Sequence, residues 1–263
     1  YQVRRVTLKF SNLPKSFQGF TIAQLSDIHS GSFDNIDEVK RGVKMVNELK
    51  ADLIAFTGDL VNNRTKEVLP FLDIFSKLSA KEGVYSIKGN HDYGMYRPWA
   101  SNDDFLADQQ QMDDVHAQMG FKLLKNEYAI IKKGSEEIQL VGVENWGLPP
   151  FPQVGDLEKA TGNVDAPFRV LLSHDPSHWD EKVRPNAKNY DLTLSGHTHG
   201  MQFGVEIPGL IKWSPVKYRY PRWAGLYQEG KEYLYVNRGF GFLGFPGRVG
   251  IMPEITLITL ETA

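Results

Sequence analysis

The chain has 263 residues and no cysteine, which excludes disulfide bonds and thiolate metal ligands. Hydrophobic residues make up 41% and charged residues 24%, a composition that is typical of globular proteins and excludes an intrinsically disordered chain. The formal net charge of −2 argues against a dedicated nucleic-acid-binding surface, which is usually strongly basic, although a local patch can still bind nucleotides.

The first third of the chain alternates between short apolar runs, typical of buried strands, and amphipathic runs, typical of helices. Strands are expected at residues 3–10, 20–25, 53–57 and 83–87. A helix is expected between residues 35 and 50, with Asp34 as its N-cap, because apolar residues recur there at three- and four-residue spacing. A second helix is expected at residues 66–78, with Pro70 near its start.

The rest of the chain continues this alternation. A helix is expected at residues 103–118, where His116 is predicted to lie on the surface. Strands follow at residues 128–132, 138–143, 168–172, 192–194, 233–236 and 255–260. No internal repeat, low-complexity tract or linker interrupts the pattern, so we expect one α/β domain that spans residues 1–263.

Five short motifs follow five of these strands. In chain order they are Asp27-Ile28-His29, Gly58-Asp59, Gly89-Asn90-His91-Asp92, the lone His174, and Gly196-His197-Thr198-His199. The carboxyl ends of strands are where α/β sheets place their ligand sites. Carboxylate, amide and imidazole groups bind divalent metals, so the set predicts a site for two metal ions.

Several details of these motifs leave alternatives open. In extended chain, the rings of His197 and His199 would point to one side, whereas a tight turn would send each ring to a different ion. The glycines of the motifs allow tight turns or a close backbone approach. We expect a structural role for His178, although it lies four residues after His174, and a turn at Asp175 before Pro176.

The ordered set of motifs resembles the calcineurin-like metallophosphoesterase superfamily, whose pattern is D-x-H, G-D, G-N-H-D/E, a single His, then G-H-x-H. By motif, the resemblance covers residues 27–199. It implies an α/β fold in which two mixed β-sheets pack as a sandwich flanked by helices. It also implies that the chain is a hydrolase of phosphoric esters or anhydrides.

The resemblance further implies a division of the ligands between two divalent ions. Asp27, His29 and His199 would hold one ion, Asn90, His174 and His197 the other, and Asp59 would bridge both. Manganese, zinc or iron suits such an imidazole-rich, carboxylate-bridged site better than magnesium does.

By the same resemblance, His91 contacts the phosphate and protonates the leaving oxygen, and the neighbouring Asp92 is expected to orient its imidazole. The implied mechanism is in-line attack on phosphorus by a metal-bridging hydroxide, without a covalent enzyme intermediate. Asn62 stands where many relatives carry Asp, and we expect it to influence the site only indirectly.

Residues 211–248 mix aromatic and basic side chains. Such a mixture is found in membrane-interface surfaces, nucleobase platforms and lipid-phosphate pockets, and equally in core aromatics with solvated charges. The glycine-rich stretch 237–248 reads as a loop with exposed apolar tips that reaches the metal-bearing edge. Arg238 and Arg248, at the two ends of this loop, are predicted to bind substrate.

This C-terminal part resembles the bacterial YkuE/YaeI-like branch of the superfamily, whose members are membrane-associated or exported phosphodiesterases. We therefore expect a bacterial protein that acts on a phosphodiester or pyrophosphate, with a lipid-linked or UDP-sugar-lipid compound as one substrate class. We also expect a membrane or lipid partner, export or anchoring through a segment before Tyr1, and a monomer. The alternatives are a phosphomonoesterase, a nucleotide phosphodiesterase, and a non-catalytic, metal-stabilised binding protein.

Overall fold

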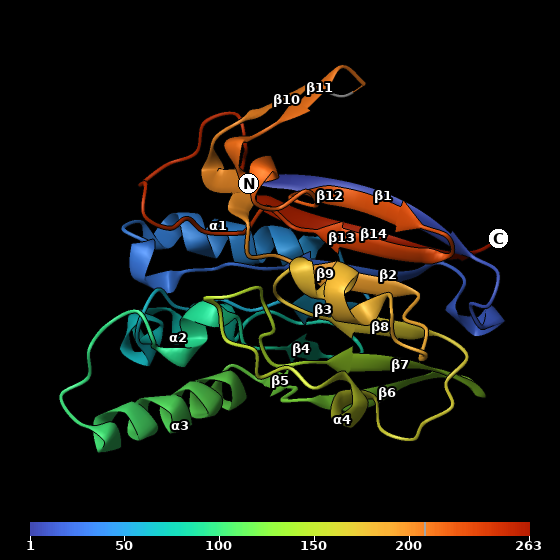
Figure 1. Ribbon diagram of the computed structural model, residues 1–263, viewed down its shortest axis with the longest axis horizontal. Coiled ribbons are helices and arrows are strands. Elements are labelled where there is room, and N and C mark those ends of the chain that lie inside the picture. The colour runs from blue at the N-terminus through green and yellow to red at the C-terminus, as the bar shows by residue number, and fades with distance from the viewer. Residues whose placement is uncertain (208) are drawn as a thin grey trace.

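Two six-stranded mixed sheets pack against each other, and helices cover the outer sides of the pair (Figure 1). The structure is a computed structural model that describes residues 1–207 and 209–263. The strand orders are β1-β14-β2-β3-β4-β5 in the first sheet and β12-β13-β9-β8-β7-β6 in the second, and β10 and β11 form a separate hairpin. The predicted sandwich of two mixed sheets is confirmed.

The strands and helices have the following bounds. The first sheet contains β1 Gln2–Phe10, β2 Phe20–Leu25, β3 Leu53–Phe56, β4 Val84–Ser86, β5 Phe121–Leu123 and β14 Glu254–Thr262. The second contains β6 Glu127–Lys133, β7 Glu136–Gly142, β8 Arg169–Leu172, β9 Leu192–Ser195, β12 Gly225–Glu229 and β13 Glu232–Val236, and the hairpin contains β10 Val205–Ile207 and β11 Ile211–Trp213. The α-helices are α1 Ile36–Glu48, α2 Leu72–Phe75, α3 Asn102–Gln118 and α4 Leu157–Thr161.

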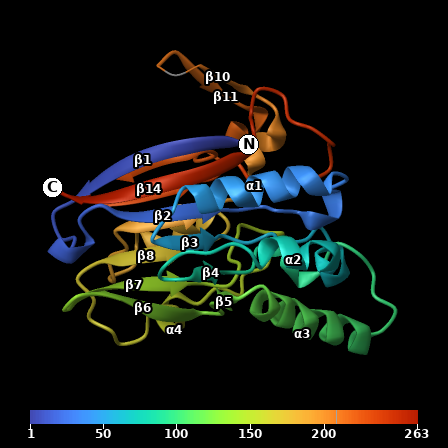
Figure 2. The ribbon, with the colours of Figure 1, turned by 180° about the vertical axis from the view of Figure 1, so that it is seen from behind.

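The largest apolar layer lies between the sheets, where inward-facing side chains such as Ile22 and Tyr85 meet Leu140 and Leu194 of the opposite sheet. A second layer lies between the first sheet and helices α1, α2 and α3. A third lies between the second sheet and α4 with the π-helical turn Trp179–Val183. Figure 2 shows α1, α2 and α3 together on one side of the sandwich. Burial on both faces explains why the central strands are almost wholly apolar.

Helix α1 follows the amphipathic pattern that predicts it. Val39, Val43 and Val46 are buried on one face. The N-cap is Asn35 and not Asp34, because the Asn35 side chain accepts hydrogen bonds from the backbone N–H groups of Asp37 and Glu38.

The predicted helix at residues 66–78 is largely wrong. The chain forms two 3₁₀ turns, Thr65–Glu67 and Leu69–Phe71, and only then the short helix α2. Pro70 lies inside the second turn, where it can donate no backbone hydrogen bond. Ile74 and Phe75 are nevertheless buried, so the segment packs against the core without forming a continuous helix.

The predicted surface position of His116 is also wrong. Its side chain is 0% exposed and packs near the rings of Phe56 and Phe121. Its Nδ1 lies 2.9 Å from the Ser86 hydroxyl, and burial lowers the pKa of the imidazole to about 3. A polar helix can therefore face the core with a neutral imidazole beside its buried apolar residues Met112 and Val115.

The parallel neighbours β2, β3 and β4 in one sheet, and β8 and β9 in the other, carry all five motifs at their carboxyl ends. Sequence reasoning missed β5, α4, the hairpin and β12, which are short or rich in exposed residues. Among residues 1–207 and 209–263, no helix combines the length and the apolar character that crossing a bilayer requires.

Candidate metal centre

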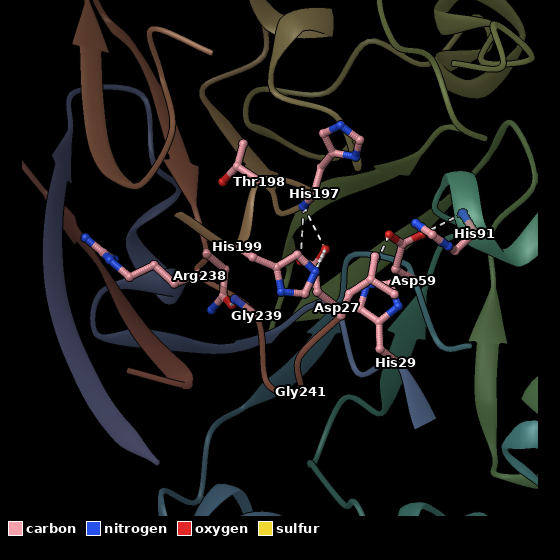
Figure 3. A network of polar contacts seen from close by, with 12 residues as sticks. Asp27, His29, Asp59, His91, His197, Thr198, His199, Arg238, Gly239 and Gly241 are labelled. Atoms are coloured by element: carbon pink, nitrogen blue, oxygen red, sulfur yellow. Dashed lines mark hydrogen bonds and ion pairs between the residues drawn. The ribbon is translucent and has the colours of Figure 1, made fainter. Parts of the chain in front are cut away.

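The motif residues converge in the loops at the ends of these strands and form two adjoining groups of potential metal ligands. The first group consists of Asp27, His29 and His199, whose ligand atoms lie within 4.8 Å of one another. The second consists of Asp59, His174 and His197, within the same limit. Figure 3 shows Asp27, His29, Asp59 and His199 gathered at one point between the strand ends.

In the first group, the Nε2 atom of His199 lies 3.3 Å from Oδ1 of Asp27. Both ring nitrogens of His29, and Nε2 of His199, are buried and have no hydrogen-bond partner in the part of the chain that the structure describes. Leaving a buried polar atom unpaired costs free energy unless a ligand pairs with it. These orphan imidazole nitrogens therefore fit a bound cation.

In the second group, Nε2 of His174 lies 3.1 Å from Oδ2 of Asp59, and Nδ1 of His174 donates to the carbonyl of Thr57 at 2.7 Å. The side-chain oxygen of Asn90 lies 3.1 Å from Nε2 of His174 and 2.8 Å from Nδ1 of His197. Asn90 thus joins the second group, as the predicted ligand set requires.

Asp59 lies between the two groups. Its Oδ2 atom is 3.1 Å from the His174 imidazole of the second group and 3.5 Å from Nε2 of His29 in the first. Its Oδ1 atom accepts a hydrogen bond from the backbone N–H of His91 at 2.9 Å. This is the position that a bridging carboxylate needs.

The residue types and their spacing fit two divalent cations, and the charges of the site show what such ions would neutralise. Burial would raise the pKa of Asp59, but the imidazoles of His174 and His91 hold it well below its usual range. Despite burial, Asp59 raises the pKa of His174 to about 10, whereas burial lowers that of His29 to about 3. Without cations, the negative charges of Asp27 and Asp59 are compensated mainly by the neighbouring imidazoles.

The backbone is held in an uncommon conformation at five of these positions. Asp27, His29, Asp59, His197 and His199 all have left-handed φ values, between 48° and 71°. Such values are uncommon outside glycine and concentrate where function demands a particular side-chain direction. The resulting turn sends His197 and His199 to different groups, as Figure 3 shows, so the structure supports the turn alternative over the extended one.

Two motif glycines explain how the loops come so close. A Cβ atom at Gly89 would collide with the Asp59 carboxylate, and one at Gly196 would collide with Asp27 and the Ser26 hydroxyl. Any other residue at either position would push a carboxylate out of place.

His91 lies beside the second group without joining it. Its Nδ1 is 2.7 Å from the backbone carbonyl of Asn62, and because a carbonyl only accepts, Nδ1 carries the hydrogen. Nε2 is then the nitrogen that can exchange a proton with a substrate. The ring of Tyr96 packs at 4.5 Å from that of His91, and the Tyr96 hydroxyl accepts from the side-chain amide of Asn90.

The prediction that Asp92 orients the His91 imidazole is wrong. The Asp92 carboxylate accepts hydrogen bonds from the backbone N–H groups of Asp59, Leu60, Val61 and Gly89, at 2.8 to 3.2 Å. Burial and the charge of Asp59 raise the pKa of Asp92 to about 6. Asp92 therefore holds the loop that carries the bridging carboxylate, while the backbone of Asn62 orients the imidazole.

Arg238 does not bind substrate as predicted. Its side chain is 2% exposed, and it donates to Glu254 at 2.5 Å and to Glu206 at 2.6 Å. Both carboxylates raise the pKa of the guanidinium against the opposing effect of burial. Figure 3 shows the side chain directed away from the histidines.

Arg248 is also engaged by the protein, which contradicts its predicted role. Its guanidinium donates to the backbone carbonyls of Arg238, Gly239 and Gly241, and one nitrogen lies 3.3 Å from Nδ1 of His199. Burial lowers the pKa of Arg248 to about 10. Arg248 braces the glycine-rich loop against the first ligand group.

Sequence reasoning did not identify Tyr220 and Asp175 as site residues. The Tyr220 hydroxyl lies 2.8 Å from Nε2 of His197, and it donates to the Asp175 carboxylate at 3.4 Å. A carboxylate and a hydroxyl in this position fix the orientation of a ligating imidazole. Asp175 directly follows His174, and that adjacency was the available signal; its predicted turn is confirmed by a hydrogen bond from the backbone N–H of Ser177. His178 has the expected structural role, since it pairs with the Ser173 hydroxyl and stacks on Trp146.

The family is decided by comparison with known proteins. The family model described as calcineurin-like phosphoesterase matches residues 20–201, which contain all five motifs. The chain belongs to the calcineurin-like phosphoesterase family. This membership, together with the two ligand groups, supports phosphoesterase activity that depends on divalent metal.

Its relatives within the family include bacterial and animal proteins. The chain is 32% identical, over 97% of its own length and 84% of the relative's, to the uncharacterized metallophosphoesterase YkuE of Bacillus subtilis. It is 29% identical to the phosphodiesterase YaeI of Escherichia coli, over 92% and 82% of the two chains. A zebrafish transmembrane protein with a metallophosphoesterase domain is 29% identical over 98% of this chain but only 57% of its own.

Solved structures show the same phosphoesterase fold. The NAD nucleotidase of Haemophilus influenzae superimposes with a TM-score of 0.52 over 82% of this chain and 44% of its own, at 13% identity. The sulfate thiohydrolase SoxB gives a TM-score of 0.51 over 95% and 57% of the two chains, at 11% identity. At such identities the likeness concerns the fold alone.

Proposed function

We propose that residues 1–263 form one domain that hydrolyses a phosphodiester or pyrophosphate bond with the help of two divalent metal ions. The observation that carries this proposal is the position of the Asp59 carboxylate within 3.5 Å of an imidazole from each ligand group. Manganese, zinc or iron suits the six-ligand set of carboxylates and imidazoles, with the Asn90 amide as a seventh ligand. When bound, the two cations would lower the pKa of a water and neutralise phosphate oxygens.

The side chains of the protein would supply the remaining chemistry. His91, whose Nδ1 is fixed on the Asn62 carbonyl, would present Nε2 to the leaving oxygen and donate its proton as the phosphorus–oxygen bond breaks. Asp92 and the motif glycines would hold the bridging loop in place while this occurs. Tyr220 and Asp175 would keep His197 in its ligating orientation.

The first experiment compares hydrolysis of bis(4-nitrophenyl) phosphate and 4-nitrophenyl phosphate. The protein is stripped with a chelator and refilled with Mn²⁺, Zn²⁺ or Fe²⁺, beside the variants His91→Ala and Asp59→Asn. We expect metal-dependent diesterase activity that falls at least about 100-fold in both variants. Tyr128→Phe, at an exposed position on β6, serves as the matched control.

Other outcomes of that experiment favour the alternatives. Turnover of the monoester alone would favour a phosphomonoesterase, and preferential turnover of nucleotide diesters a nucleotide phosphodiesterase. Two tightly bound cations without turnover of either substrate would favour a non-catalytic, metal-stabilised protein. Folded His91→Ala and Asp59→Asn variants that retain full activity would contradict the proposed site.

We further propose that the substrate is lipid-linked and that the protein meets a bilayer surface as a monomer. Support comes from a group of exposed apolar side chains in residues 201–211 and 245–252, which we call the apolar rim: Met201, Phe203, Val205, Ile207, Leu210, Ile211, Phe245, Val249 and Met252. The rim includes the β10–β11 hairpin, which projects from the sandwich in Figure 1, and Leu210 is 79% exposed. Exposed apolar groups of this extent mark interaction surfaces.

The rim is continuous with the glycine-rich loop, because Phe203 pairs with Val249 and the Gln202 amide donates to the carbonyls of Phe245 and Gly247. The aromatic residues of the stretch 211–248 are partly core and partly surface. Tyr220, Trp223 and Phe240 are buried, whereas Tyr218 is exposed.

Vesicle sedimentation tests the lipid proposal. We expect vesicles of phosphatidylcholine and phosphatidylglycerol in a 3:1 ratio to retain the protein, and Leu210→Ser/Ile211→Ser to lower retention several-fold. Leu106→Ser, at an exposed position on α3, is the control. Absence of retention, together with good turnover of soluble nucleotides, would reject the lipid proposal while leaving the hydrolase intact.

A further inference from the structure

Tyr96 contacts two residues of the candidate metal centre. Its hydroxyl oxygen is 2.7 Å from the side-chain amide nitrogen of Asn90, and its ring centroid is 4.5 Å from that of His91. The residue is nevertheless 45% exposed. The phenol therefore touches one proposed metal ligand and the proposed proton donor, while part of its surface stays open to solvent.

The chain on both sides of Tyr96 is fixed by contacts of its own. The backbone turns at Gly94, whose φ of 63° is left-handed, and the carbonyl of Gly94 accepts from the indole N–H of Trp99 at 2.8 Å. The guanidinium of Arg64 lies over the Trp99 ring and donates to the carbonyl of Pro98 at 3.0 Å. Because both ends of this short segment are anchored, the phenol is held in place before a ligand arrives, as a preorganised donor must be.

The hydrogen bond between Asn90 and Tyr96 has a definite direction. The side-chain oxygen of Asn90 faces the imidazoles of His174 and His197, so its amide nitrogen faces Tyr96. An amide nitrogen only donates, and the tyrosine oxygen therefore accepts. The hydroxyl hydrogen of Tyr96 is left over, and in the described part of the chain no side chain or carbonyl accepts it.

The other tyrosine beside this ligand group, Tyr220, uses both parts of its hydroxyl within the protein. Its oxygen lies 2.8 Å from Nε2 of His197, and its hydrogen is donated to the Asp175 carboxylate at 3.4 Å. Tyr96 has a described partner for the acceptor role alone. Its unused O–H donor thus lies next to residues that the proposed function brings to a phosphate.

We propose that Tyr96 binds the scissile phosphate by donating its hydroxyl hydrogen to a non-bridging oxygen of that group. This inference rests on the proposed function for its substrate. Water forms the new bond to phosphorus and releases a proton to solvent, while the bond to the leaving oxygen breaks with its electron pair on that oxygen. His91 supplies the proton to the leaving oxygen, and Tyr96 keeps its own hydrogen throughout. Negative charge gathers on the oxygens around phosphorus, where a fixed donor stabilises it.

Tyr96→Phe removes the donor and keeps the ring beside His91. In the metal-loaded protein we expect kcat/KM for bis(4-nitrophenyl) phosphate to fall between about 10- and 100-fold, because one hydrogen bond to a charged group is lost. Tyr128→Phe on β6, where the residue is 40% exposed, is the matched control and should keep full activity. An unchanged kcat/KM in Tyr96→Phe would overturn the proposal.

Calorimetric titration with Mn²⁺ separates phosphate binding from mere orientation of Asn90. If Tyr96 only held the Asn90 amide, Tyr96→Phe would weaken Mn²⁺ binding by about 10- to 100-fold, as is typical when a ligand loses the group that orients it. We expect a change of less than about threefold, because water can replace the acceptor at this half-exposed position. Tyr220→Phe, which removes a group that orients His197, measures the size of an orientation effect. A loss of Mn²⁺ affinity in Tyr96→Phe as large as in Tyr220→Phe would overturn the proposal.

Binding of inorganic phosphate distinguishes this inference from the proposed function, because it needs no turnover. In calorimetry on the Mn²⁺-loaded protein we expect Tyr96→Phe to weaken phosphate binding about tenfold and Tyr128→Phe to leave it unchanged. That loss, without turnover of any substrate, would refute the hydrolase and retain the phosphate donor. Equal phosphate affinity in the two variants, with an active unmutated protein and an inactive His91→Ala, would refute the donor alone.

Discussion

Two clusters of buried charge lie close together in this protein, and they differ in how their charges are compensated. The first is a network in which two guanidinium groups pair with two carboxylates: Arg4, Arg238, Glu206 and Glu254. Its three shortest nitrogen–oxygen distances are 2.5 to 2.7 Å. In the second, the candidate metal centre, the carboxylates of Asp27 and Asp59 lie beside imidazoles and accept backbone N–H hydrogen bonds, and within the described residues neither forms an ion pair with a lysine or arginine.

The difference separates a structural role from a ligand site. Buried ions that are paired within the chain need no outside partner, whereas an unpaired one imposes a large desolvation cost. At the candidate metal centre, three imidazole nitrogens of His29 and His199 have no hydrogen-bond partner in the described residues. Arg238 was mistaken for a substrate ligand because sequence shows that a charge is present and not whether it is already paired.

Removing the metal should have the largest effect on the free energy of unfolding. If removal had no effect, the contrast between the two clusters would not hold. We expect a chelator to lower the free energy of unfolding by about 4 kcal/mol for each cation that had been present at a thousandfold excess over its Kd. Thermal unfolding with and without chelator measures the change. Asp59→Asn should show a much smaller shift, and an unchanged melting temperature of the unmutated protein would show that the centre needs no cation.

A somewhat smaller effect is expected in the arginine–glutamate network. Arg238→Gln leaves the buried Glu254 with only the longer 3.5 Å contact to Arg4 as an ion pair, so the free energy of unfolding should fall by about 3–5 kcal/mol in urea denaturation. Arg41→Gln, which removes an exposed ion pair with Glu38 on α1, should cost less than about 1 kcal/mol. Equal costs for the two variants would remove the distinction between buried and exposed pairs.

The smallest of the three effects concerns His116, a buried titratable group outside both clusters. Burial lowers its pKa to about 3 in the folded state, below the ordinary value of 6.5, so the unfolded chain binds the proton more strongly. The stability that the neutral imidazole contributes is fully present above pH 6.5 and is lost as the pH falls toward 3. At pH 5 the loss amounts to about 2 kcal/mol. His116→Phe should flatten the pH dependence of the melting temperature between pH 6.5 and 5, and an unchanged slope would contradict this account.

Much of the fold followed from periodicity and from the strand–motif order. The central strands were predicted nearly to the residue because burial on both faces makes them continuous apolar runs, as at Phe20–Leu25. The segment around Pro70 and the β10–β11 hairpin were missed, because their conformation depends on turn geometry and tertiary contacts more than on apolar spacing.

The convergence of the motif residues into two groups of potential ligands was predictable because each motif places polar side chains directly after a buried strand. The partners of those side chains were not predictable in the same way. Asp92 accepts a hydrogen bond from the backbone of Asp59, which lies 33 residues earlier in the chain. Tyr220 contacts His197, which lies 23 residues earlier. Such contacts arise only when two strand ends meet, and no local pattern encodes them.

The most direct test of the account is a calorimetric titration of the chelator-stripped protein with Mn²⁺, beside Asp59→Asn and Asp27→Asn. If Asp59 bridges two ions, the unmutated chain binds two cations, Asp59→Asn weakens both sites, and Asp27→Asn weakens mainly one. Binding of a single cation, or an Asp59→Asn variant that weakens one site and leaves the other unchanged, would contradict the central role of Asp59.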